Sequence, residues 1–234
     1  MKVASLVAGK VAGAEAIEDR ALLRHGGMGK VFTNAYAPST LGSFLRSLTF
    51  GHVRQLDAVA ARFLTGLATT TPLVAGVDEY ALVDIDDTII EVHVYGKQGS
   101  GCGYAGVRAL NALLATVTAD KTPGGHAIIE QVHAELKNSA LAHLPSGKFA
   151  ANAAWLVLAV MAFNLTRAAG TLAGPTMAKA TTATIRRKLV HVPARIASSA
   201  RRLSLRLPSG WPWETAWTTL FTGLSAPPPA VATT

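Results

Sequence analysis

Half of the 234 residues are hydrophobic, enough to bury one sizeable core or two small ones. The single cysteine, Cys102, excludes an internal disulfide and a cysteine-rich zinc site. A chain without disulfides is expected in the reducing cytoplasm. The net charge of +8 is uneven: residues 1–136 carry 11 basic and 13 acidic side chains, whereas residues 137–234 carry 11 basic side chains and the single acid Glu214. Such a basic half favours nucleic acid as a partner, then an anionic membrane surface, although a solvated surface without a dedicated partner has the same composition.

Helical patterns dominate the first part of the chain. The N-terminal run MKVASLVAGKVAG is interrupted by Lys10, so we expect no export signal there. Residues 13–24 predict a helix. The later segment STLGSFLRSLTFGHVRQLDAVAARFLTGLA has apolar residues at helical spacings and predicts two helices broken near Gly51, with Ser39 or Thr40 as the first N-cap.

The middle of the chain changes to strand patterns. Residues 80–96, YALVDIDDTIIEVHVYG, are dense in β-branched and aromatic residues and predict one strand or two short ones. Residues 105–119 fit either a helix or a strand. The run HAIIEQVHAELKNSALAHL, which begins at residue 126, again predicts a helix, because its apolar residues recur at spacings of three and four.

Residues 149–166 form a long uncharged run, FAANAAWLVLAVMAFNLT. As a helix it would measure about 27 Å, slightly less than a hydrocarbon core of about 30 Å. Its alanines, Asn152 and Asn164 favour a helix buried in protein, and the alternative is a small membrane-associated protein anchored by this run. The terminal SAPPPAVATT is expected to be disordered.

The glycines at 101–106 spell GxGxxG after the predicted strand, and Asp120 follows 19 residues after the first of them. This spacing is typical of a dinucleotide-binding loop. The chain lacks the alternating strands and helices of a doubly wound sheet, so we interpret the motif as a glycine-rich hairpin connection.

Three carboxylates interrupt the predicted strand. Because side chains alternate along a strand, Asp84 and Asp86 should project from one face and Asp87 from the other. Carboxylates in an apolar strand are costly unless they are paired, hydrated or metal-bound. Two acids on one face could share a divalent cation, whereas a strand end with solvated acids is the structural alternative.

Long runs of the sequence resemble transposases of bacterial insertion sequences. They are APSTLGSFLRSLTFGHVRQLD (37–57), DIDDTIIEVHVYGKQGSGCGYAGVRALNALLATV (84–117), HAIIEQVHAELKNSALAHLPSGKFAANAAWLVLAVMAFNLTRAAG (126–170) and ATTATIRRKLVHVPARIASSARRLSLRLPSGWPWETAW (180–217). The chain resembles the DDE class with a ribonuclease-H-like core, in particular the IS-thirteen-eighty family. The resemblance implies metal-dependent DNA strand cleavage and strand transfer with two Mg²⁺ or Mn²⁺ ions.

The resemblance also implies roles for individual residues. The family's Asp-x-Thr pattern falls on Asp86, which becomes the first catalytic aspartate and metal ligand. The family's catalytic glutamate precedes a lysine with six residues between them, so the resemblance implies that Glu130 is this glutamate and a metal ligand, and that Lys137 is the lysine. Asp84 and Asp87 become acids that support the ligands.

The sequence departs from the family pattern in several places. The family's tyrosine and arginine before the glutamate are replaced by Pro123 and His126. Only 43 residues separate Asp86 from Glu130, and no second catalytic aspartate is recognisable among them. We therefore expect an internal deletion near residues 120–125, with a short natural variant as the alternative. We also expect a start inside the family's N-terminal region and loss of two core strands that leaves apolar strand surface exposed.

These observations predict a catalytically impaired DDE transposase that keeps its affinity for double-stranded DNA at transposon ends, with a homodimer as a further expected assembly. The basic residues expected to contact DNA are Lys137, Arg186, Arg187, Lys188, Arg195, Arg201 and Arg202. An amphipathic helix with a solvated basic face is the alternative for the arginine-rich part.

The expected fold class is α/β, with an incomplete ribonuclease-H-like core of few strands and a predominantly helical remainder. Three units are predicted: a helical N-terminal remnant (1–76), a truncated catalytic core (77–170) and a basic C-terminal region with a disordered tail (171–234).

Overall fold

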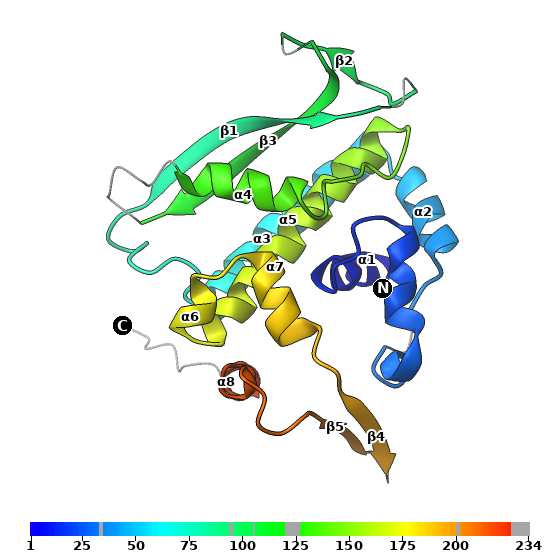
Figure 1. Ribbon diagram of the computed structural model, residues 1–234. Helices are drawn as coiled ribbons and strands as arrows, with labels where there is room; N and C mark the ends of the chain where they lie inside the picture. Colours follow the sequence, from blue (N-terminus) through cyan, green and yellow to red (C-terminus); the bar gives the residue numbers. More distant parts are fainter. Residues whose placement is uncertain (33–34, 94–95, 105, 120–126, 200–201, 226–234) are drawn as a thin grey trace.

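The computed structural model describes residues 1–32, 35–93, 96–104, 106–119, 127–199 and 202–225. Helix α5 (Phe149–Leu172) runs through the middle of the molecule and is contacted by helices from both ends of the chain (Figure 1). These helices are α1 (Lys2–Val11), α2 (Pro38–Arg46), α3 (Phe50–Thr70), α6 (Pro175–Ala178), α7 (Thr182–Ile185) and α8 (Glu214–Ser225).

Helix α5 is apolar around most of its circumference, and the surrounding helices bury much of this surface. Half of its most apolar 18-residue stretch is buried, although its length and composition alone would allow it to cross a membrane. Trp155, Leu158 and Ala154 are fully buried and belong to one hydrophobic cluster with Leu6 of α1 and Leu45 of α2. This cluster draws on the first two predicted units, whose division stays a prediction.

A buried cation joins α1 to α5. Lys10 is almost completely buried, and its ammonium lies 3.2 Å from the centroid of the Trp155 ring. The Trp155 indole N–H donates to the carbonyl of Ala140 at 2.6 Å, and Lys10 Nζ donates to the same oxygen at 3.4 Å. Helix α1, the segment after residue 137 and helix α5 are therefore held together at one point.

The N-terminal helices differ from the predicted ones. Helix α1 was not predicted, and the expected helix over 13–24 is wrong, because Gly13 has a φ of 93° and 3₁₀ turns occupy Glu18–Arg24 and Gly26–Lys30. The 3₁₀ turn over Glu18–Arg24 nevertheless contacts α1 and α2, and the one over Gly26–Lys30 contacts β4.

Helices α2 and α3 confirm the predicted pair, with different boundaries. Helix α2 begins at Pro38 with Ala37 as its N-cap, so the predicted cap at Ser39 or Thr40 is wrong. The break between the two helices lies before Gly51, because α3 begins at Phe50. Thr49 is its N-cap and forms a capping box with His52.

The strands form a three-stranded antiparallel sheet. Strand β1 (Leu82–Glu91) pairs with β3 (Arg108–Thr118), and β3 pairs on its other edge with the short β2 (Gly101–Cys102). The prediction for residues 80–96 is confirmed as one strand. The ambiguous residues 105–119 become a strand because β1 supplies a long partner. The GxGxxG motif lies in the β2–β3 hairpin, as interpreted from the sequence.

The two faces of the β1–β3 pair differ in their surroundings. Asp84, Asp86, Thr88 and Ile90 lie on an inner face, and α4 (Ala127–Lys137) packs against both strands. The outer face is open among the described residues and strongly apolar, with Ile85 63% and Leu113 68% exposed. Its other exposed apolar side chains are Val83, Ile89 and Val117. The expectation of exposed apolar strand surface is therefore confirmed.

The C-terminal part contains a hairpin that was not predicted. After α7, a π-helical turn (Arg186–Val190) leads to β4 (Arg195–Ser199) and β5 (Arg202–Arg206), which pair antiparallel and project from the lower end of the molecule in Figure 1. A second small cluster, built on Met177, Ile185 and Leu189, is packed by the tryptophans before and within α8.

A close approach of α5 and α7 gives a test of this packing. A Cβ on Gly170 would lie 2.6 Å from Ile185 Cδ1 and 2.9 Å from the Met177 carbonyl oxygen. We expect Gly170→Ala to lower the free energy of unfolding by about 1–3 kcal/mol through overpacking. Gly66→Ala is the control, because a Cβ added to Gly66 of α3 would have no neighbouring atom within 4 Å. This substitution should raise the free energy of unfolding by about 0.5–1 kcal/mol. Urea denaturation measures both, and equal effects would contradict the packing.

Candidate functional site

Asp86 lies in the middle of β1 on the inner face, beside α4. Its neighbours in this strand alternate as predicted, with Asp84 on the same face and Asp87 on the outer face. The Asp86 side chain is 51% exposed, so water hydrates part of the carboxylate. Because the carboxylate is accessible to water, it avoids the full cost of placing a charge in an apolar strand.

His133 of α4 is the closest ionic partner of Asp86. Its Nδ1 lies 3.7 Å from Asp86 Oδ2, which is an ion pair when the imidazole is protonated. The residue is only 7% exposed, and its Nε2 has no hydrogen-bond partner among the described residues. A buried imidazole with an open nitrogen is unusual, because buried polar atoms are normally hydrogen-bonded. No sequence pattern had indicated a role for His133.

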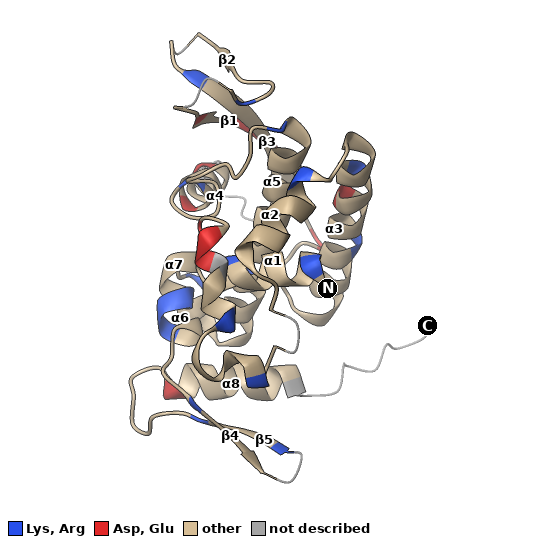
Figure 2. Cartoon of the chain, turned by 90° about the vertical axis from the view of Figure 1, so that its right-hand side faces the viewer, with Lys and Arg blue, Asp and Glu red and all other residues tan. Residues whose placement is uncertain are grey.

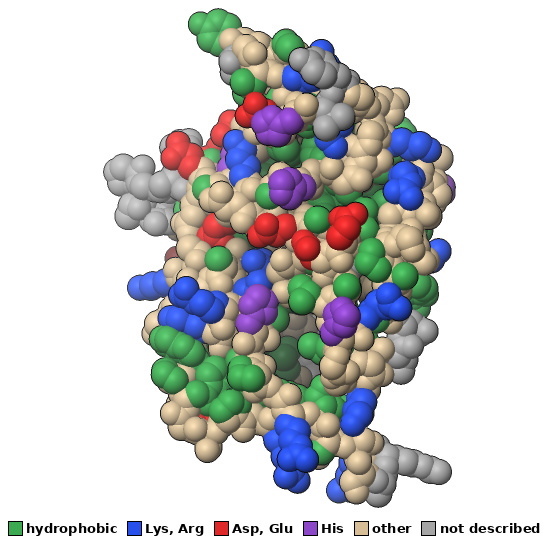
Figure 3. Space-filling view, turned by 45° about the vertical axis from the view of Figure 1, so that its right-hand side comes forward, with side chains coloured by type: hydrophobic (Ala, Val, Ile, Leu, Met, Phe, Trp, Pro, Cys, Tyr) green, Lys and Arg blue, Asp and Glu red, His purple; other side chains and the backbone are tan. Residues whose placement is uncertain are grey.

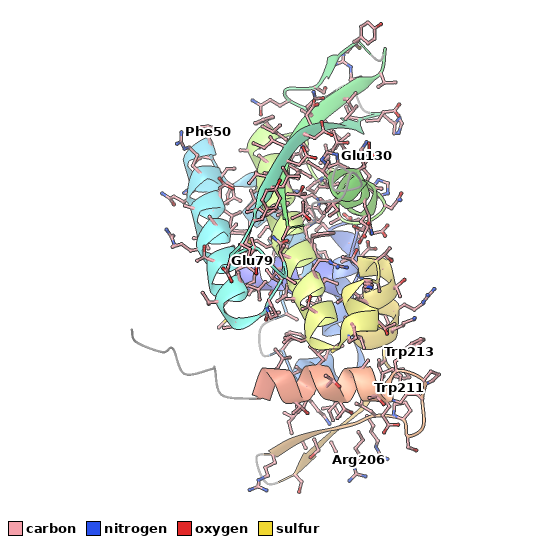
Figure 4. The ribbon with its side chains drawn as sticks, turned by 90° about the vertical axis from the view of Figure 1, so that its left-hand side faces the viewer. Phe50, Glu79, Glu130, Arg206, Trp211 and Trp213 are labelled. Carbon is pink, nitrogen blue, oxygen red and sulfur yellow. The ribbon has the colours of Figure 1, made fainter. Side chains whose placement is uncertain are left out.

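Glu130 lies on the same helix, one turn before His133. Its side chain is exposed, and Figure 4 labels it on α4 beside the sheet. The two predicted ligands thus come from neighbouring elements, since α4 packs against β1 and His133 links α4 to Asp86. Glu130 also lies in the first turn of α4, where a negative charge is favourable.

Among the described residues, Glu91 does not complete the site. Glu91 lies on the outer face of β1 and pairs with His93 at 3.7 Å, so it points away from Asp86. Asp120 is outside the described residues, as are Pro123 and His126. Within the described ranges, no three side chains of His, Cys, Asp or Glu come close enough together to hold a metal ion.

A second acid, Asp87, faces a different environment. Its carboxylate accepts a hydrogen bond from Asn111 Nδ2 of β3 at 2.9 Å. Both residues line an open cavity of about 770 Å³ that also includes Cys102 and Lys137. The structure therefore places Lys137 and Asp87 around one depression, whereas Asp86 lies on the other side of the strand.

The basic residues of the C-terminal half divide into internal and exposed groups. Arg167 donates to the carbonyls of Ala178 and Ala180 at the end of α6. Arg186 donates to the Val11 carbonyl at 3.1 Å, and burial lowers the pKa of its guanidinium, an effect that the nearby Glu15 and Glu135 oppose. Arg167 thus joins α5 to the end of α6, and Arg186 joins the segment after α7 to α1, so both side chains have structural roles.

The remaining cations are more accessible. Arg187, Arg195 and Arg202 are exposed, and Lys188 lies with its ammonium 3.5 Å from the centroid of the Trp213 ring. Arg201 is outside the described residues. Figure 2 shows basic residues along β4 and β5, and Figure 3 shows basic side chains at this end of the molecule, separated from a band of acidic ones nearer the sheet.

Helix α4 is also tied to this basic part of the chain. Glu135 Oε2 accepts hydrogen bonds from the backbone N–H and the hydroxyl of Thr182, at 2.7 and 2.6 Å. The carboxylate thereby satisfies donors in the first turn of α7. The helix that carries Glu130 and His133 is thus joined directly to the segment that leads to Arg187.

Carboxylate oxygens such as those of Asp86 and Glu130 are ligands that Mg²⁺ accepts, and pairs of divalent ions catalyse displacement at phosphodiesters. Residues 127–228 match the family model described as Transposase DDE domain group 1. The match supports a DDE transposase and suggests a function in transposition; DDE transposases in general depend on divalent metal ions. No curated protein and no solved structure matches the chain.

The matched region begins at α4 and extends through β4 and β5 to the end of α8, the last described element. It therefore includes Glu130, His133 and the basic residues, whereas β1 with Asp86 precedes it. The signal that could have revealed His133 is its position in the repeat Ile129, His133, Leu136, where a polar residue occupies a core-facing site.

Proposed function

We propose that this chain descends from a DDE transposase of the IS-thirteen-eighty type, binds double-stranded DNA through its basic C-terminal half, and is impaired in catalysis. The match of residues 127–228 to the transposase DDE domain carries this proposal. The charge balance supports it, because residues 137–234 hold 11 basic residues and one acid. Binding to transposon ends, a homodimer and a cytoplasmic location are parts of the same proposal.

The fold proposal is an incomplete ribonuclease-H-like core. The antiparallel β1–β3 pair, the short β2 and the covering helix α4 are consistent with part of such a core. The exposed outer face of β1 and β3 is what the loss of neighbouring core elements would leave. The proposed internal deletion falls at residues 120–125, between β3 and α4.

Asp86 and Glu130 are the residues that would hold Mg²⁺ or Mn²⁺. The ions would supply charge stabilisation for an in-line displacement at a phosphodiester. Asp86 contributes an accessible carboxylate from the strand, and His133 fixes the position of that carboxylate against α4. Glu130 contributes a solvent-exposed carboxylate from the first turn of α4. Asp84, on the inner face of β1, would support the ligands from the strand.

The DNA proposal is tested by titrating a short mixed-sequence duplex at several salt concentrations. Each phosphate that the protein neutralises should add about 0.9 to the negative slope of log K against log salt. With Arg187, Lys188, Arg195 and Arg202 in contact, we expect a slope of about −3 to −4, or roughly a hundredfold loss of affinity between about 50 and 200 mM salt. Affinity that is flat over this range would exclude phosphate neutralisation and with it the proposed function.

A further inference from the structure

The hairpin of β4 and β5 has two chemically different faces. Its register pairs Arg195 with Arg206, Ala197 with Ser204, and Ser199 with Arg202. Paired residues of an antiparallel ribbon point to the same side. Arg195, Arg202 and Arg206 therefore share one face with three small residues, and we call it the arginine face.

The opposite face is apolar and partly rests on the body of the protein. It carries Ile196, Leu203 and Leu205. Ile196 packs close to Gly27, where an added Cβ would lie 3.0 Å from Ile196 Cδ1. This contact with the 3₁₀ turn Gly26–Lys30 positions β4, so the arginine face is directed away from that turn.

The three arginines are available for an outside partner. All three are exposed, and among the described residues none has a hydrogen-bonded or ion-paired side-chain partner. Glu214, the single acid of this half, accepts instead from the backbone N–H of Gly210. Figure 4 shows Arg206 at the opposite end of the molecule from the sheet.

The spacing on this face suits duplex DNA. Arg202 and Arg206 are four residues apart on β5, a distance of roughly 13.6 Å at about 3.4 Å per residue. The same distance spans about four base-pair steps of 3.4 Å. A two-stranded ribbon fits the major groove of B-DNA, and the small residues between the arginines let the backbone approach the base edges.

We propose that the β4–β5 ribbon enters the major groove of duplex DNA and contacts guanine edges through Arg195, Arg202 and Arg206. This inference rests on the proposed DNA binding and adds which groove is occupied, which element enters it and which base is read. Guanine is the expected base because its N7 and O6 accept a bidentate pair of hydrogen bonds from arginine.

The first test compares two triple variants with equal charge. The ribbon variant carries Arg195→Gln, Arg202→Gln and Arg206→Gln, and the control carries Arg46→Gln, Arg54→Gln and Arg62→Gln on α2 and α3. Both lower the net charge from +8 to +5, and all six arginines are exposed. The ribbon variant should bind a mixed-sequence duplex about 10²- to 10³-fold more weakly at about 0.1 M salt, because three arginine contacts with guanine edges are lost. The control should retain the wild-type affinity at the same salt concentration.

The second test replaces every guanine of the duplex by 7-deazaguanine, which removes the N7 acceptor and leaves the phosphates unchanged. Wild-type affinity should fall by about fivefold or more, whereas the ribbon variant should bind both duplexes equally. Thermal unfolding of all proteins, followed by circular dichroism, should give matching midpoints, because the substituted residues lie on the surface.

Three results would overturn the inference while leaving DNA binding intact. They are equal losses in the two triple variants, wild-type affinity unchanged by 7-deazaguanine, and a ribbon variant that loses affinity only for phosphatidylserine vesicles. A wild-type protein without salt-dependent affinity for the duplex would instead overturn the proposed function itself.

Discussion

Replacing Trp155 with alanine is expected to lower the free energy of unfolding by about 3–5 kcal/mol. The indole is completely buried in α5, donates its N–H to the Ala140 carbonyl, and provides the ring over which the Lys10 ammonium lies. Its removal leaves a cavity and also uncovers a buried cation. Urea denaturation followed by circular dichroism measures the change as a lower midpoint at a similar slope.

The matched control is Trp155→Phe. It keeps an aromatic ring near Lys10 and loses the hydrogen bond to Ala140, so the expected cost is smaller, about 1–3 kcal/mol. If the free energy of unfolding of Trp155→Ala lies within about 1 kcal/mol of the wild-type value, α5 is not the centre of the core.

The wild-type chain is expected to bind supercoiled plasmid DNA without nicking it in the presence of Mg²⁺ or Mn²⁺. A two-ion displacement needs several carboxylates around the ions, and the sequence between Asp86 and Glu130 contains only Asp87, Glu91 and Asp120 as further acids. Asp87 lies on the outer face of β1. Glu91 lies on the outer face of β1, turned away from Asp86. The measurement is the fraction of relaxed plasmid with metal compared with the fraction in EDTA.

Metal-dependent nicking above that background would contradict catalytic impairment. In that case Asp86→Ala and Glu130→Ala should each remove it, because each removes one proposed ligand. Asp57→Ala, an exposed acid on α3, is the matched control and should leave the nicking rate unchanged. Nicking that survives both ligand substitutions would come from outside this site.

Local patterns in the sequence predicted the elements around the acidic site. The β-branched run around Asp84 and Asp86 predicted β1, and the alternation of side chains correctly assigned Asp87 to the opposite face. The apolar spacing of Ile129 and Leu136 predicted α4. These features depend on residues close in the chain, where periodicity is informative.

Features that depend on tertiary placement could not be predicted in the same way. The contact of Lys10 with Trp155 and the capping of Thr182 by Glu135 join residues 145 and 47 positions apart. No local pattern encodes either pair. The match of residues 127–228 supported the transposase resemblance, whereas the approach of His133 to Asp86 became visible only once α4 was placed on the sheet.

The β4–β5 ribbon was missed although it carries a period-two signal. Leu203 and Leu205 alternate with Ser204 and Arg206, as expected for a strand with one apolar face. The clustered arginines indicated a DNA-binding surface, with an amphipathic helix that has a solvated basic face as the alternative. Each strand has only five residues, too few for periodicity to separate a strand from a helix end.

The open outer face of β1 and β3 also has a consequence for the behaviour of the chain in a crowded cell. Exposed apolar side chains such as Ile85 and Leu113 lie beside β1, whose outer edge is unpaired among the described residues, and such an edge attracts other extended polypeptides. The four acids of β1 oppose such pairing, because bringing two of these edges together would place like charges opposite one another. Removing these charges by Asp→Asn and Glu→Gln substitution should therefore increase self-association of the chain through this edge.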